Sequence, residues 1–373
     1  MKKVLYVATV ASHICQFHLP YLEMLHNNGV CVHVAARNNL GEKNGLQLKF
    51  TDEYFDIPFE RSPKSKRNIK AYKELKKLIS ENKYDLIVCN TPMGSILTRL
   101  AARKSRKEGT KVIYIAHGFH FYRGAAKKNW AVFYPIEKIF ARLCDMVITI
   151  NEEDFQLAKD KFKTDVRHIH GIGVNDERYH SVDDDTKKEL RAKIGLDSDD
   201  FSILCTGELN KNKNQIELLG AAALLTDKIP NLKILLAGNG PNENELLSEI
   251  KKLNLKDTVK LLGYRTDLEN IVPCVDLVVS CSRREGMPLN IIEALLCEKA
   301  VVATYNRGHN ELIKDGINGY LVSPDSSEDM ADRIGMLFEK RELMDEFGQE
   351  GYKLAQKYTV KSVAKELLNL LSV

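Results

Sequence analysis

Short apolar runs separated by helix-like stretches are the feature that most constrains the fold of this chain. The runs occupy residues 4–10, 31–37, 84–90, 111–117 and 145–150 in the first half, and 201–207, 232–238, 259–264, 276–282 and 300–304 in the second. Short, continuous apolar runs alternating with helical patterns are typical of parallel strands buried on both faces. The sequence therefore predicts an α/β fold with two Rossmann-like, doubly wound parallel-sheet domains.

The length of 373 residues fits two domains, because one hydrophobic core rarely serves more than about 250 to 300 residues. The boundary is expected within residues 170–200, which are rich in Asp, Gly and Ser and contain no buried strand pattern. We therefore predict an N-terminal domain over 1–175 and a C-terminal domain over 176–356. The last helix, about 357–373, is expected to pack back on the first domain.

The composition indicates a globular protein of the cytoplasm. No apolar stretch approaches the roughly 18 residues that a membrane-spanning helix needs, and the apolar run at the N-terminus is too short for a signal peptide. The eight cysteines include no CxxC pair and fall mostly in apolar elements. This favours reduced core residues over disulfides or a zinc site.

The loops after the strands carry the functional information, because parallel sheets bind ligands beyond the carboxyl ends of their strands. The first of them, TVASHICQF, contains no glycine, and the chain has no Walker phosphate loop. A dinucleotide fold needs glycines there for the tight turn and the close pyrophosphate contact. NAD or FAD chemistry and ATPase chemistry are therefore not expected.

Three loops of the second half are different. GELNKNKNQ carries Lys211 and Lys213 just before a helix predicted from Gln215, and GNGPNENEL and GYRTDLENIV begin with glycine. A lysine beside a helix N-terminus can hold phosphate, and glycine lets a ligand approach the backbone. Turns that simply connect strands to helices explain these residues equally well.

The stretch EGMPLNIIEA places one glutamate before a helix and another within it. Because Gly286 and Pro288 are disfavoured inside a helix, the helix is predicted to start between Met287 and Leu289, with free N–H groups suited to an anion. Glu285 would lie just ahead of that site and Glu293 two turns along the helix. They could bind sugar hydroxyls, or they could be a capping and a solvated carboxylate; spacing leaves both readings open.

Five motifs in order, GELNKNK, LAGNGP, LLGYRTD, EGMPLNIIEA and GHNELIKDGINGYLV, resemble the retaining glycosyltransferases of family four. The resemblance covers essentially the whole chain and implies the GT-B fold, in which two Rossmann-like domains face each other across a cleft. The stretches YIAHGFHFYRGA, NTPMGSILTRLAAR and NEEDFQLAKD resemble the subgroup that builds bacterial capsular and exopolysaccharide repeat units.

The resemblance implies roles for individual residues. Glu285 and His117 would be catalytic, with Glu285 against the transferred sugar and His117 between this sugar and the acceptor. Lys213 would bind the donor diphosphate and Glu293 the ribose hydroxyls. The remaining donor-binding residues implied are Gly207, Gly238, Gly263, Tyr264, Arg265, Gly286, Met287, Pro288, Leu289 and Asn290, of which Gly263 to Arg265 would lie by the base. Ser12, His13 and His120 would face the acceptor, although His120 is equally explained as an aromatic packed beside Phe119 and Phe121.

One departure from the family pattern concerns the phosphate. Family members usually carry an arginine where this chain has Glu208, so a bidentate phosphate clamp is missing. Arg283, Arg284 or Lys211 are the candidates to replace it.

The expected enzyme moves a sugar, with retention, from a nucleotide donor, most simply a UDP-sugar, to a saccharide linked to a polyprenyl diphosphate. No cofactor and no metal are expected, since the one metal-like acidic cluster, Asp183 to Asp185, lies in the linker. Basic stretches at 61–77 and 103–111 suit peripheral contact with an anionic membrane, or are solvated helix faces. Nucleic acid is not an expected partner because aromatic residues are sparse there. The alternatives are a nucleotide-sugar epimerase of the same fold and a noncatalytic sugar-nucleotide-binding protein.

Overall fold

The computed structural model describes residues 1–42 and 45–371 and consists of two compact units. Unit 1 comprises residues 1–173 together with the segment from Val360 onward, and unit 2 comprises Val174–Thr359. The chain thus passes from unit 1 to unit 2 after Gly173, where the sequence predicts a boundary after residue 175.

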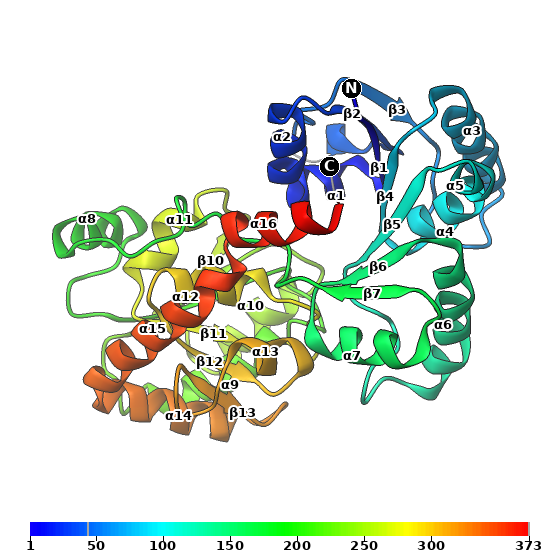
Figure 1. The fold of residues 1–373 in the computed structure, drawn as a ribbon. Coiled ribbons are helices and arrows are strands. Elements are labelled where there is room, and N and C mark those ends of the chain that lie inside the picture. Colours follow the sequence, from blue (N-terminus) through cyan, green and yellow to red (C-terminus); the bar gives the residue numbers. More distant parts are fainter. Residues whose placement is uncertain (43–44, 372–373) are drawn as a thin grey trace. The chain divides into compact units, whose positions relative to one another are not determined.

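Unit 1 is built around a parallel sheet. Its strands within the described residues are β1 (Lys3–Val10), β2 (Cys31–Arg37), β3 (Glu53–Asp56), β4 (Leu86–Asn90), β5 (Lys111–Ala116), β6 (Met146–Thr149) and β7 (Asp165–His168). They lie in the order β3-β2-β1-β4-β5-β6-β7 (Figure 1). The strand order reverses between β1 and β4, and this is where open parallel sheets bind ligands.

Helices surround this sheet, and the last one returns from the C-terminus. They are α1 (Ala11–Phe17), α2 (Leu19–Asn27), α3 (Arg67–Asn82), α4 (Pro92–Ala101), α5 (Arg103–Lys107), α6 (Lys127–Phe140), α7 (Glu152–Lys161) and α16 (Val360–Leu371), with short 3₁₀ turns at Leu40–Glu42 and Ala141–Leu143. Helix α16 packs against α2. Its Glu366 accepts a hydrogen bond from the backbone N–H of His170, with its other carboxylate oxygen 2.7 Å from the ring.

Unit 2 repeats the architecture with a smaller sheet. Its described strands are β8 (Phe201–Thr206), β9 (Leu232–Ala237), β10 (Val259–Gly263), β11 (Leu277–Ser280), β12 (Ala300–Thr304) and β13 (Tyr320–Val322), in the order β10-β9-β8-β11-β12-β13. Its helices are α8 (Asp184–Ile194), α9 (Gln215–Leu225), α10 (Glu243–Lys252), α11 (Leu268–Ile271), α12 (Leu289–Leu296), α13 (Arg307–Leu312), α14 (Ser327–Glu339) and α15 (Arg341–Ala355), with 3₁₀ turns at Val272–Cys274 and Gln356–Tyr358. The order reverses between β8 and β11, which makes their carboxyl ends the second expected ligand site.

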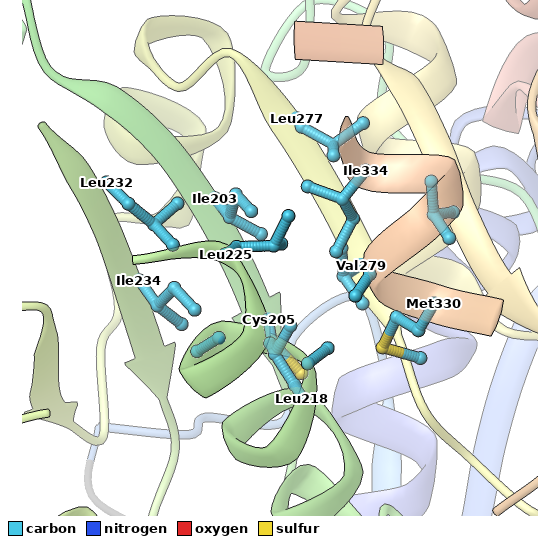
Figure 2. Packing of buried hydrophobic residues seen from close by; sticks show 14 of the residues in the cluster. Ile203, Cys205, Leu218, Leu225, Leu232, Ile234, Leu277, Val279, Met330 and Ile334 are labelled. Carbon is cyan, nitrogen blue, oxygen red and sulfur yellow. The ribbon is translucent and has the colours of Figure 1, made fainter. Parts of the chain in front are cut away.

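The core of unit 2 is a dense layer of aliphatic side chains between the sheet and two helices. Figure 2 shows Ile203, Ile234 and Val279 from the strands facing Leu218 of α9 and Ile334 of α14. On the opposite face the sheet packs against α12, whose Ile291, Ile292 and Leu295 are fully buried. Burial on both faces explains why these strands read as continuous apolar runs.

All ten apolar runs form strands, whereas three strands went unpredicted. These are β3 (Glu53–Asp56), β7 (Asp165–His168) and β13 (Tyr320–Val322), and each lies at an edge of its sheet. An edge strand has one neighbour and more solvent, so it needs no continuous apolar run, and β7 reads DVRH with alternating exposure. β13 is apolar but only three residues long.

The cysteines lie in the core, as their apolar surroundings in the sequence predict. All eight cysteines are free, and all but Cys31 are buried. Within the described residues no helix combines the length and apolar character that crossing a membrane would require.

Candidate functional site

Three glycine turns form the base of the site in unit 2. Gly207 follows β8, Gly238 follows β9 and Gly263 ends β10. The Gly207 N–H donates to the carbonyl of Ala237 at 2.9 Å, and the Gly238 N–H donates to the carbonyl of Gly263 at 2.8 Å. A Cβ on Gly238 would lie 1.9 Å from the Gly207 oxygen. The glycines therefore let neighbouring loops stack at the ends of the strands.

An ion pair between Lys213 and Glu285 lies at the centre of the site. The Lys213 Nζ is 2.7 Å from the Glu285 Oε1, and their side chains are 21% and 16% exposed. Lys213 precedes α9, in a turn where Asn210 Oδ1 accepts from the backbone N–H of Lys213 at 2.9 Å. A Cβ on Gly207 would be 3.0 Å from the Lys213 Cε, so the lysine stem crosses a surface that only glycine leaves open.

The loop that carries Glu285 is tied to the loop that carries Lys213. The Arg283 N–H donates to the Asn212 carbonyl at 2.8 Å, and the Asn212 side chain donates to the Arg284 carbonyl at 3.0 Å. Helix α12 then begins at Leu289 with Pro288 as its N-cap, within the predicted interval. Gly286 and Met287 form the turn between Glu285 and the start of α12. Glu285 and the α12 N-terminus therefore lie at the same edge of the sheet, beside the ends of β8 and β11.

Beneath this loop lies a buried polar network that the sequence did not predict. Asn306 caps α13 by accepting from the N–H groups of Gly308 and His309, both at 3.0 Å. Its amide also donates to the Ser282 carbonyl at 2.7 Å. Burial lowers the pKa of His309 to about 4, so its ring is a neutral hydrogen-bonding group between Ser280 and the Thr304 carbonyl. The signal was present, since Asn is a preferred N-cap residue.

Glu293 is the second glutamate of the motif. Burial raises its pKa to about 7, against the opposing effects of the Arg178 charge and a hydrogen bond from Tyr179. The Lys213 charge also acts on Glu293. The two predicted glutamates and the predicted lysine are thus brought into one electrostatic environment, together with Arg178 and Tyr179, which the sequence did not identify.

The remaining predicted donor residues occupy the rim. Tyr264 is 64% exposed, and Arg265 donates to Asp267 at 2.8 Å. The Asn290 amide lies 3.5 Å from the Thr206 carbonyl, which sets the first turn of α12 beside the end of β8.

Glu208, which stands where family members usually carry an arginine, is exposed. Glu208 accepts a hydrogen bond from the Asn210 amide at 2.9 Å. Of the three candidate replacements, Arg283 is engaged with Asp325 and with the Lys211 carbonyl. Arg284 and Lys211 have exposed side chains.

The predicted acceptor residues lie in unit 1, at the ends of β1 and β5. Ser12 is buried and receives a hydrogen bond from the Asn39 amide at 2.9 Å. The His13 and His117 Nε2 atoms are 3.4 Å apart. His18, which the sequence analysis did not single out, joins them with its Nε2 atom 3.2 Å from that of His117.

His120 packs on an aromatic ring, and Asp183 of the linker caps a helix. His120 is exposed and stacks on Phe133, with ring centroids 4.7 Å apart, whereas Phe119 and Phe121 are buried and stack on each other. The aromatic partner of His120 is thus Phe133, and its position facing the acceptor stays a prediction. Asp183 is the N-cap of α8, accepting from the Thr186 N–H at 2.8 Å.

Known proteins show the same two-part organisation. A family model described as glycosyl transferase 4-like matches residues 3–151, and one described as glycosyl transferases group 1 matches residues 186–354. HepE of Anabaena, solved in complex with UDP, has a TM-score of 0.79 at 22% identity, covering 100% of both chains. At that identity the likeness shows the fold.

Two curated relatives carry the likeness in sequence. UDP-Gal:alpha-D-GlcNAc-diphosphoundecaprenol alpha-1,3-galactosyltransferase of Escherichia coli is 31% identical over 269 residues, 69% of this chain and 68% of the relative. The putative glycosyltransferase EpsD of Bacillus subtilis is 42% identical over 373 residues, 100% of this chain and 96% of EpsD. The chain therefore belongs to the group 1 glycosyltransferases of family four, enzymes with the GT-B fold.

Proposed function

We propose that this glycosyltransferase moves a sugar from a UDP-sugar to a saccharide carried on a polyprenyl diphosphate, with retention of configuration and without a divalent metal. The observation that supports the proposal most is the Lys213–Glu285 ion pair, 2.7 Å long, beside the N-terminus of α12. This arrangement puts one positive and one negative side chain at the point where a sugar and its diphosphate would separate.

The charges suit bond cleavage at the anomeric carbon. As the bond to the diphosphate breaks, negative charge grows on the phosphate and positive charge on the sugar ring. Lys213 and the free N–H groups of Leu289 and Asn290 would stabilise the first, and the Glu285 carboxylate the second. Lys213 pairs with Glu285 in the structure; a bound diphosphate would compete for the lysine and free the carboxylate for the sugar. No divalent ion is needed in this scheme.

The donor and acceptor are proposed from the relatives. HepE was solved with UDP, and the Escherichia coli relative acts on a UDP-sugar and a diphosphoundecaprenol-linked sugar. The side chains of residues 61–67 are mostly exposed, as are Arg103, Lys104 and Lys107. Such cations attract anionic lipid headgroups, by roughly 1 kcal/mol each, which would bring unit 1 to the membrane that holds the acceptor.

The test is a panel of UDP-, GDP- and ADP-sugars in EDTA, each with and without a polyprenyl-diphosphate saccharide. We expect release of UDP from one UDP-sugar and a glycosylated lipid whose anomeric configuration, read by NMR, matches that of the donor. Conversion of the donor without acceptor would identify an epimerase. Binding without turnover under every condition would identify a sugar-nucleotide-binding protein, and loss of transfer in EDTA would overturn metal independence.

Donor affinity should depend on pH through Glu293. Its pKa is raised to about 7 by burial, so the carboxyl is protonated below that pH. If both oxygens must accept ribose hydroxyls, binding releases the proton, and the affinity for the UDP-sugar falls about tenfold for each pH unit below 7 and is constant above it. Calorimetric titration between about pH 5.5 and 8.5 measures this slope, with the UDP-sugar rather than UDP as ligand because the terminal phosphate of UDP itself titrates near about pH 6.

Two variants separate Glu293 from other groups. Glu293→Gln should abolish the slope and weaken binding above pH 7. Glu217, whose pKa burial also raises to about 7, is the matched control, and Glu217→Gln should keep the slope. A slope that persists in Glu293→Gln would remove Glu293 from the ribose site.

A further inference from the structure

Three histidine rings of unit 1 point their Nε2 atoms at one place. His13 lies in α1, His18 separates α1 from α2, and His117 follows β5. The His117 Nε2 is 3.4 Å from that of His13 and 3.2 Å from that of His18. One ring nitrogen of each histidine lies within 4.8 Å of the other two.

The two separations from His117 match those between ligands of a tetrahedral metal centre. Zinc binds imidazole nitrogen at about 2.0 to 2.1 Å, so two nitrogen ligands on a tetrahedron are about 3.3 to 3.4 Å apart. Both measured distances from His117 are close to this value. His13 and His117 are partly exposed, whereas His18 is buried.

Hydrogen bonding within the protein does not satisfy the three rings as well as a cation would. The His117 Nε2 also lies 3.4 Å from Asn90 Oδ1. A neutral ring nitrogen either carries one proton or offers one in-plane lone pair. The His117 Nε2 can therefore make one good hydrogen bond, although His13, His18 and Asn90 all lie near it. At least one of the other histidine nitrogens then faces the His117 Nε2 without a hydrogen bond to it. A metal ion accepts all three lone pairs.

Two features limit the affinity. The positive charge of Arg61 acts on His13 and would also oppose a cation. The His18 Nδ1 is buried without a hydrogen-bond partner among the described residues, and metal-bound histidines usually donate that proton, at a cost of 10- to 100-fold in affinity when they cannot, by order of magnitude. A dissociation constant on the order of micromolar is expected rather than the tighter value of a structural zinc site.

We infer that His13, His18 and His117 form a three-histidine site for Zn²⁺ or a chemically similar transition-metal ion such as Co²⁺. A set of three imidazoles without a carboxylate suits these ions and not Mg²⁺. Because His13 and His117 are the residues proposed to face the acceptor and the transferred sugar, occupation of the site removes their lone pairs from the reaction. Zinc is therefore an inhibitor of transfer, a consequence that rests on the proposed function.

Binding is tested without donor or acceptor. Metal-free wild-type protein is titrated with Co²⁺ and then Zn²⁺. We expect one equivalent of Co²⁺ with the visible absorption of a tetrahedral site, displaced by Zn²⁺ and not by excess Mg²⁺. His13→Ala and His18→Gln should each weaken binding at least about tenfold, while His26→Gln, at an exposed histidine of the same unit, should bind as the wild type does.

Absence of the tetrahedral spectrum from folded wild-type protein would overturn the site, as would equal Zn²⁺ binding by the His13→Ala/His18→Gln double variant, which would point to cysteines instead. Inhibition is measured afterwards with the donor identified above. Transfer should fall by half near the zinc dissociation constant and recover in EDTA. Metal binding without inhibition would confirm the metal site but refute its link to sugar transfer. The spectroscopic test does not depend on transferase activity, so it decides on the metal site even if the protein transfers no sugar.

Discussion

Lys213→Ala should lower kcat for sugar transfer by about 100- to 1,000-fold, the loss typical of removing one group that stabilises charge in a transition state. The Lys213 Nζ pairs with the Glu285 carboxylate at 2.7 Å. The fold should survive, because partly exposed ion pairs contribute only about 1 kcal/mol or less. The measurement is steady-state kcat and KM, with thermal unfolding of the same samples.

The main competing explanation is that Lys213 only neutralises Glu285 and keeps its loop in place. A double variant separates the two explanations. Lys213→Met combined with Glu285→Gln removes both charges and keeps both stems, so a structural pair would regain stability and activity together. If the two residues act on the leaving phosphate and the sugar, stability returns to the wild-type value and activity stays low.

A matched control comes from a lysine in an ordinary ion pair of the same unit. Lys252 pairs with Glu249 at 2.8 Å on the surface of α10, and Lys252→Ala should leave kcat and KM unchanged. A Lys213→Ala enzyme with more than about a tenth of the wild-type kcat would contradict the assignment of Lys213 to the diphosphate.

The sequence predicted the interior of each sheet better than its edges. Runs such as residues 201–207 and 276–282 are mostly apolar because helices cover both faces of the sheet. The edge strands β3 and β7 carry charged residues, for example Asp165 and Arg167, and their strand conformation depends on a neighbour that is distant in sequence. Hydrophobic periodicity cannot report such a neighbour.

The part of the site whose residues lie in one short segment could be predicted from the sequence. EGMPLNIIEA contains both glutamates and the helix start, and helix α12 begins where Pro288 indicates. Contacts between segments were not predictable from spacing: His13 and His117 are separated by 104 residues, and the approach of His18 to them follows from the order of β1, β4 and β5 in the sheet. Glu293's neighbour Tyr179 likewise comes from the segment before α8.

Gly308→Ala should reduce kcat by about ten- to a hundredfold while the enzyme remains folded, because small displacements of reacting groups have effects of this size. A Cβ at Gly308 would lie 2.8 Å from the Glu285 Cβ and 3.0 Å from its carbonyl oxygen. Helix α13 cannot retreat easily, since Asn306 and Thr304 both bond to the Ser282 carbonyl at 2.7 Å. The Glu285 loop must therefore move instead.

The matched control is Gly335, a helical glycine in α14 of the same unit. A Cβ there would meet only the Leu225 Cδ2, at 3.7 Å, so Gly335→Ala should stabilise the protein by about 0.5 to 1 kcal/mol and leave activity unchanged. If Gly308 acts only by positioning Glu285, its substitution should cost nothing further in a Glu285→Gln background, where the displaced carboxylate is already absent. Additive losses in the double variant would show that Gly308 supports another part of the site, and full activity in Gly308→Ala would show that the Glu285 loop accommodates the methyl group without consequence for transfer.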